Sequence, residues 1–157
     1  MAPSMKLIHA SAVSAGICLM VLVASAQQKP DFSGRWVIVT PAESAGLEQV
    51  VKHDATTLTT AHASEGAGHA TIYKLDGSES RNVIVSHGSD LVTLSRVSWS
   101  GNKLIITSAT TYPDGRKLDQ KQEWSLDSDG RLMIELTESM QGGPPTTTTL
   151  VHKKRST

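Results

Sequence analysis

Cysteine and aromatic residues are scarce in this chain. Its 157 residues include one cysteine, Cys18, together with three tryptophans, two tyrosines and one phenylalanine. A single cysteine excludes an intrachain disulfide and a metal site built from several thiolates. The stability of the fold must therefore come from side-chain packing and backbone hydrogen bonds.

The chain also has no excess of charge of either sign. Lysine and arginine number 15, and aspartate and glutamate number 15, so the formal net charge is zero at pH 7. Proteins that bind nucleic acid or an anionic membrane surface usually carry a basic surplus. We therefore expect neither of these as a partner.

The first 26 residues have the pattern of a secretory signal peptide. Lys6 supplies positive charge, residues 10–23 are an apolar run, and Ala24-Ser25-Ala26 fits the small-residue cleavage pattern. The apolar run is shorter than the roughly 20 residues of a spanning helix, which argues against a retained membrane anchor. We expect cleavage near Ala26, a secreted or periplasmic mature protein, and one domain over residues 27–157.

Windows rich in Ala, Leu, Glu and Lys, which are typical of amphipathic helices, are missing as well. Thr, Ser, Val and Ile dominate instead, and β-branched residues favour strands. We expect one short helical turn over residues 41–46. Ten strands are predicted at approximately residues 34–40, 47–53, 56–62, 69–75, 81–86, 90–99, 103–112, 117–126, 131–138 and 146–153.

Three tight-turn sequences separate the later strands, namely Ser100-Gly101-Asn102, Pro113-Asp114-Gly115 and Asp127-Ser128-Asp129-Gly130. They supply the positive-φ or proline-fixed positions that hairpins require. Consecutive hairpins predict an all-β fold, an antiparallel up-and-down meander of about 8–10 strands. A sheet of this kind protects its edges by closing, so we expect a barrel, with a β-sandwich as the alternative.

The segment Phe32-Ser33-Gly34-Arg35-Trp36 opens the first predicted strand. This opening, the chain length and the meander resemble the lipocalin and calycin group, in particular short secreted bacterial lipocalin-like domains. The resemblance implies that Trp36 packs at one barrel end above Gly34, covered by a basic side chain from the last strand, here Lys153, Lys154 or Arg155. The chain departs from the group in lacking a clear Thr-Asp-Tyr-like second motif and a C-terminal helix.

Strand alternation places two amides, Gln120 and Gln122, on the same face as Trp124. Buried amides without partners cost a few kcal/mol, so on an inward face they need each other, water or a ligand. The other interpretation is a register in which this face is partly solvated. If the face is inward, the predicted ligand-binding residues are Leu104, Ile106, Tyr112, Leu118, Gln120, Gln122, Trp124, Leu132 and Ile134.

No other motif indicates chemistry. The histidines that follow the expected cleavage point match no metal-binding spacing, so we expect scattered surface histidines, no metal and no cofactor; they are His53, His62, His69, His87 and His152. No Gly-x-Ser-x-Gly element frames a nucleophilic serine, and no catalytic residue is predicted.

These observations favour an extracytoplasmic protein that binds a small, largely apolar ligand without catalysis. An interaction module with a filled core and a protein partner is the second hypothesis, and a hydrolase or other enzyme is the third. A continuous internal cavity would favour the first hypothesis, whereas a solid core would favour the second.

Overall fold

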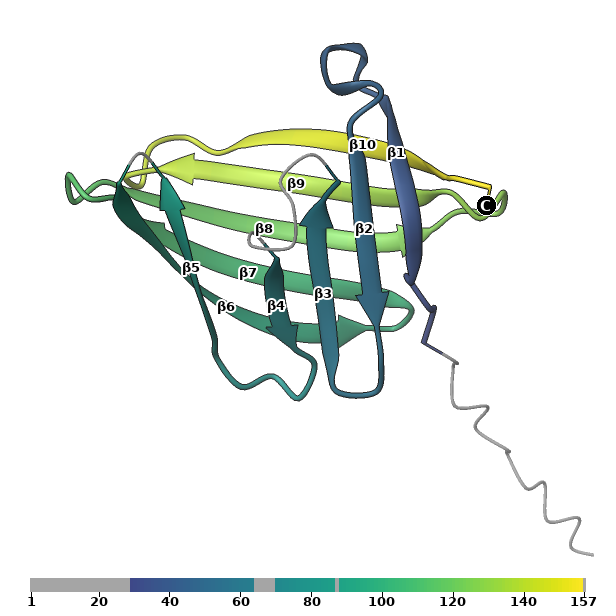
Figure 1. The fold of residues 1–157 in the computed structure, drawn as a ribbon, viewed down its shortest axis with the longest axis horizontal. Helices are drawn as coiled ribbons and strands as arrows, with labels where there is room; N and C mark the ends of the chain where they lie inside the picture. Colours follow the sequence, from purple (N-terminus) through teal and green to yellow (C-terminus); the bar gives the residue numbers. More distant parts are fainter. Residues whose placement is uncertain (1–28, 64–69, 87, 157) are drawn as a thin grey trace, which may run out of the picture.

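The computed structural model describes residues 29–63, 70–86 and 88–156 (Figure 1). The predicted signal peptide, His69 and His87 lie outside these residues. Within the described part, no helix is long and apolar enough to cross a membrane.

In the described residues, ten strands, all antiparallel to their neighbours, form a single sheet in the order β4-β3-β2-β1-β10-β9-β8-β7-β6-β5. The strands are β1 (Gly34–Thr40), β2 (Glu48–His53), β3 (Thr57–His62), β4 (Thr71–Lys74), β5 (Ser80–Ser86), β6 (Ser89–Ser100), β7 (Lys103–Thr111), β8 (Lys117–Leu126), β9 (Leu132–Met140) and β10 (Thr146–Lys154), and a 3-10 turn, η1 (Ala42–Ser44), follows β1. Strands β1 to β4 cross over β6 to β9 (Figure 1). The predicted all-β class, meander order and barrel are confirmed, and the short turn after the first strand is present.

Side chains, rather than a backbone ladder, connect the two edge strands, β4 and β5. The backbone N–H of Ile72 donates to Asn82 Oδ1, and Asn82 Nδ2 donates to the Ile72 carbonyl, both at 2.9 Å. The Lys74 N–H donates to Ser80 Oγ at 2.8 Å. We call this junction the β4–β5 seam, formed by residues 71–74 and 80–86. The barrel is therefore nearly closed.

The inner face of the sheet changes from apolar to polar along the barrel. Successive rows of facing residues across β7 to β10 are Leu104–Trp124–Ile134–Leu150, then Ile106–Gln122–Leu136–Thr148, then Ser108–Gln120–Glu138–Thr146. The fully buried apolar side chains gather in the apolar rows and at one end of the barrel. Hydrogen-bonded hydroxyl pairs continue the polar rows onto β6, where Ser95 contacts Ser108 at 2.8 Å.

Trp36 closes the apolar end of the barrel. Its side chain is 1% exposed, and its Nε1 donates to the Phe32 carbonyl at 2.9 Å. Lys154 Nζ lies 5.4 Å from the indole centroid, so Lys154 supplies the cation expected over this ring. Gly34 has φ +148°, and a Cβ there would lie 2.6 Å from Lys154 Cε. The backbone conformation therefore favours glycine, and a Cβ would also displace the flexible end of the Lys154 side chain.

The other two basic candidates lie elsewhere. Lys153 is paired with Val37 on the opposite face of β10, and Arg155 forms an ion pair with Glu48, which also binds Arg35.

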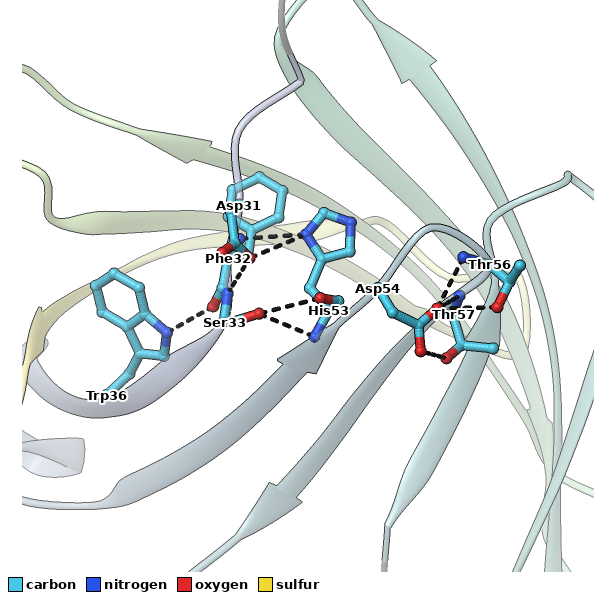
Figure 2. A network of polar contacts seen from close by, with 8 residues as sticks. All are labelled: Asp31, Phe32, Ser33, Trp36, His53, Asp54, Thr56 and Thr57. Atoms are coloured by element: carbon cyan, nitrogen blue, oxygen red, sulfur yellow. Dashed lines mark hydrogen bonds and ion pairs between the residues drawn. The ribbon is translucent and has the colours of Figure 1, made fainter.

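A polar network fixes the entry to β1 at this same end (Figure 2). Ser33 Oγ accepts from the His53 N–H and donates to the His53 carbonyl, both at 3.1 Å, and the Phe32 N–H donates to His53 Nδ1 at 3.3 Å. The His53 ring stacks on Phe32 and Trp99, with centroids 5.7 and 6.2 Å away. His53 therefore packs among aromatic rings, which corrects the expectation that it lies on the surface.

Candidate ligand-binding cavity

A cavity of about 200 Å³, partly open to the surface, lies between β2–β4 on one side and β8–β10 on the other. Its lining residues all belong to the inner face; they are Gln49, Thr60, His62, Thr71, Tyr73, Gln122, Trp124, Ile134, Leu136 and Leu150. The volume is below the roughly 300–1,000 Å³ of sites for drug-sized molecules. The cavity therefore suits a molecule with one ring or a short chain.

The two walls of this cavity differ in chemistry. Strands β2, β3 and β4 contribute polar side chains, whereas β8, β9 and β10 contribute Trp124, Ile134, Leu136 and Leu150. His62 is exposed, and it lies at the end of β3 where the cavity reaches the surface. A molecule with an apolar body and one polar edge would match both walls.

Gln122 is the polar residue on the otherwise apolar wall, and Trp124 fixes its orientation. Trp124 Nε1 donates to Gln122 Oε1 at 2.8 Å. An indole N–H is only a donor, so it selects the amide oxygen and leaves the amide NH₂ for other partners, of which the Tyr73 phenol is one. An amide NH₂ carries two hydrogens, so Gln122 keeps donor capacity for a bound molecule beside its contact with Tyr73.

Tyr73 is the main buried hydroxyl of the polar wall and is 7% exposed. Burial raises the pKa of its phenol, an effect that the hydrogen-bonding side chains of Thr60 and Gln122 partly offset. The phenol therefore stays protonated at neutral pH and keeps a donor as well as an acceptor.

The structure distributes the nine predicted ligand-binding residues among four places. Gln122, Trp124 and Ile134 line the cavity. Leu104, Ile106 and Leu132 are each 0% exposed and belong to the packed core. Leu118 and Gln120 continue the inner face of β8 beyond the cavity. Tyr112 lies just after β7, under Arg116, whose guanidinium is 5.4 Å from the ring centroid.

Sequence reasoning did not find the opposite wall of the cavity. Alternation does place Gln49 with Val51 and Thr60 with Leu58 on inward faces. Nothing in the sequence, however, showed that β2 to β4 would lie across from β8 to β10.

His152 corrects the expectation of surface histidines most clearly. Its side chain is 0% exposed, between Ile38 and Leu132, and within the described part neither ring nitrogen has a hydrogen-bond partner. Burial lowers the pKa of His152, a nearby His62 acts in the same direction, and the backbone groups of Leu132 and Leu150 partly offset both effects. The described residues contain no group of three or more His, Cys, Asp or Glu side chains that could hold a metal ion.

A larger depression, about 520 Å³, lies on the outside of the barrel. Leu94, Arg96, Thr107, Lys121 and Thr137 border it, and each alternates along its strand with a residue of the inner face. Three residues of the inner face, Ser95, Ser108 and Gln120, also border it, so the depression is lined mainly, but not wholly, by the outer face of β6–β9.

Comparison with protein-family models finds no match, and comparison with curated proteins finds no significant match.

Proposed function

We propose that this protein binds a small molecule inside its barrel and carries out no reaction on it. The ligand would have an apolar body, held against Trp124, Leu136 and Leu150, and a polar edge facing Tyr73 and Gln122. The observation that carries the proposal is the cavity of about 200 Å³ between these two walls. The fixed Gln122 amide adds to it, because its NH₂ group is not used by Trp124.

The ligand of this proposal is more polar at one edge than the largely apolar ligand expected from the sequence. Apolar contacts would supply most of the affinity, and the amide and phenol would fix orientation. We also propose that the chain is a lipocalin-like protein, exported after removal of residues 1–26. The Lys154–Trp36 contact at the closed end supports this resemblance.

The second candidate is an interaction module that binds a protein partner on its outer surface. The depression of about 520 Å³ over β6–β9 is the observation that favours it. Substitutions at two adjacent residues of β9 can distinguish the two candidate functions, because Leu136 faces the cavity and Thr137 faces the outer depression.

The test is to screen mature protein against a panel of single-ring compounds by ligand-observed NMR. Leu136→Trp should fill the cavity and abolish binding, whereas Thr137→Trp should leave binding unchanged. Circular dichroism and melting curves establish that both variants fold. Absence of binding across the panel, or loss of binding only in Thr137→Trp, would contradict the proposal.

A further inference from the structure

Acidic side chains are distributed unequally between the two faces of the sheet. Among the strand residues that the structure describes, Glu138 is the one acidic side chain on the inner face, where it follows Ile134 and Leu136 at two-residue steps. The acids Glu48 and Glu123 lie on the outer face, and each contacts two basic side chains. The inner-face carboxylate of Glu138 therefore differs from those of Glu48 and Glu123, which are paired with basic side chains.

Glu138 has a single polar partner among the described residues. Gln120 Nε2 donates to Glu138 Oε1 at 2.7 Å, and no described basic side chain forms an ion pair with this carboxylate. A carboxylate offers about four acceptor positions, so most of its capacity remains. The residue is half-buried, so a cation that reached it would be partly shielded from water.

The carboxylate lies next to the cavity along the same strands. Gln122 faces Leu136 on the cavity wall, and the next inward pair is Gln120 and Glu138. Two residues of a strand span about 7 Å. A molecule whose ring occupies the cavity therefore needs only a short spacer to bring a charged group to Glu138.

We infer that the ligand is a small organic cation, an amine whose ring or chain lies in the cavity and whose ammonium contacts Glu138. This inference rests on the proposed function and names its ligand class. The ammonium would replace water at the free acceptor positions, and charge-assisted hydrogen bonds are about twice as strong as neutral ones. Gln120 holds the carboxylate toward the inner face, which makes it a positioning residue.

The inference is tested with three probes of matched shape and different charge: 2-phenylethylamine, 2-phenylethanol and 3-phenylpropanoate. Affinities are measured by calorimetry at pH 7 for wild type, Glu138→Gln and Glu135→Gln. Glu135 is on the same strand but exposed on the outer face, so its variant removes an equal charge at a control position.

Wild type and Glu135→Gln should bind the amine about tenfold more tightly than the alcohol, and the propanoate least. In Glu138→Gln the preference for the amine should disappear, while the affinity for the alcohol changes less than about twofold. Equal affinities for amine and alcohol in wild type, or an unchanged preference in Glu138→Gln, would overturn the inference and leave the proposed function standing. Absence of binding by all three probes, together with a negative panel screen, would instead defeat the proposed function.

Discussion

The side-chain amide of Asn82 makes two hydrogen bonds to the backbone of Ile72, at 2.9 Å each, and so takes the place of a backbone pair between the edge strands. This contact and Ser80 connect β4 to β5 at the end of the seam nearest their connecting turn. The edges of both strands would otherwise expose unpaired backbone groups.

Asn82→Ala should lower the free energy of unfolding by about 1–2 kcal/mol, because two solvent-exposed hydrogen bonds, each contributing roughly 0.5–1 kcal/mol, are lost. Chemical denaturation measures this change. Arg81→Ala, at the exposed neighbouring position, should change stability by less than about 0.5 kcal/mol. Equal effects of the two substitutions would show that the amide does not support the seam.

Gly34→Ala should destabilise the barrel by about 1–3 kcal/mol, because its φ of +148° is accessible almost only to glycine and the new methyl group would displace the Lys154 side chain. Gly46, with φ +89° and open space around it, provides the control. Gly46→Ala should strain the backbone but bring the new methyl group into contact with no other side chain. It should therefore not alter the near-ultraviolet circular dichroism of the tryptophans. A spectrum of Gly34→Ala identical to wild type would contradict the proposed displacement over Trp36.

His152 should make stability depend on pH. Its folded-state pKa lies below the ordinary histidine value because the ring is buried, so the unfolded chain binds the proton more readily. The contribution of the neutral His152 ring to the free energy of unfolding is complete above about pH 6.5. It is lost as the pH falls toward the folded-state pKa, at up to about 1.4 kcal/mol per pH unit.

The measurement is the free energy of unfolding from pH 8 to pH 5 for wild type and His152→Leu. The leucine variant should lose less stability over this range, and it should be at least as stable near pH 8 because no hydrogen bond of the ring is removed. Parallel pH profiles for the two proteins would count against a buried neutral imidazole.

Gln122→Leu should weaken ligand binding and also lower stability. The substitution removes the acceptor of the buried Trp124 N–H, which costs about 1–3 kcal/mol. Gln122→Glu retains an oxygen for the indole but removes the amide NH₂, so it should weaken binding of a hydrogen-bond acceptor such as 2-phenylethanol while preserving the indole contact. Calorimetry with Gln122→Glu measures the loss, and unchanged affinity would exclude a donor role for Gln122.

The sequence predicted the fold better than the cavity, for physical reasons. Two-residue alternation in β8 correctly placed Gln120, Gln122 and Trp124 on one face, since strand geometry is local. The partnership of this face with Tyr73 depends on how the barrel closes, which is set by long-range pairing. His152 follows Leu150 on the inner face, but its polar character suggested an exposed position. Burial of an unpaired imidazole is a cost that only the packed structure reveals.

The central claim is that the ligand site lies inside the barrel. A ¹H–¹⁵N NMR titration of labelled wild-type protein with 2-phenylethylamine tests it most directly, once the resonances are assigned. The account predicts shifts of the Trp124 indole N–H and of the backbone amides of Thr60, Gln122 and Leu136, which belong to the cavity walls. Shifts confined to outer-face positions such as Thr107, Lys121 and Thr137 would place the site in the surface depression and contradict it.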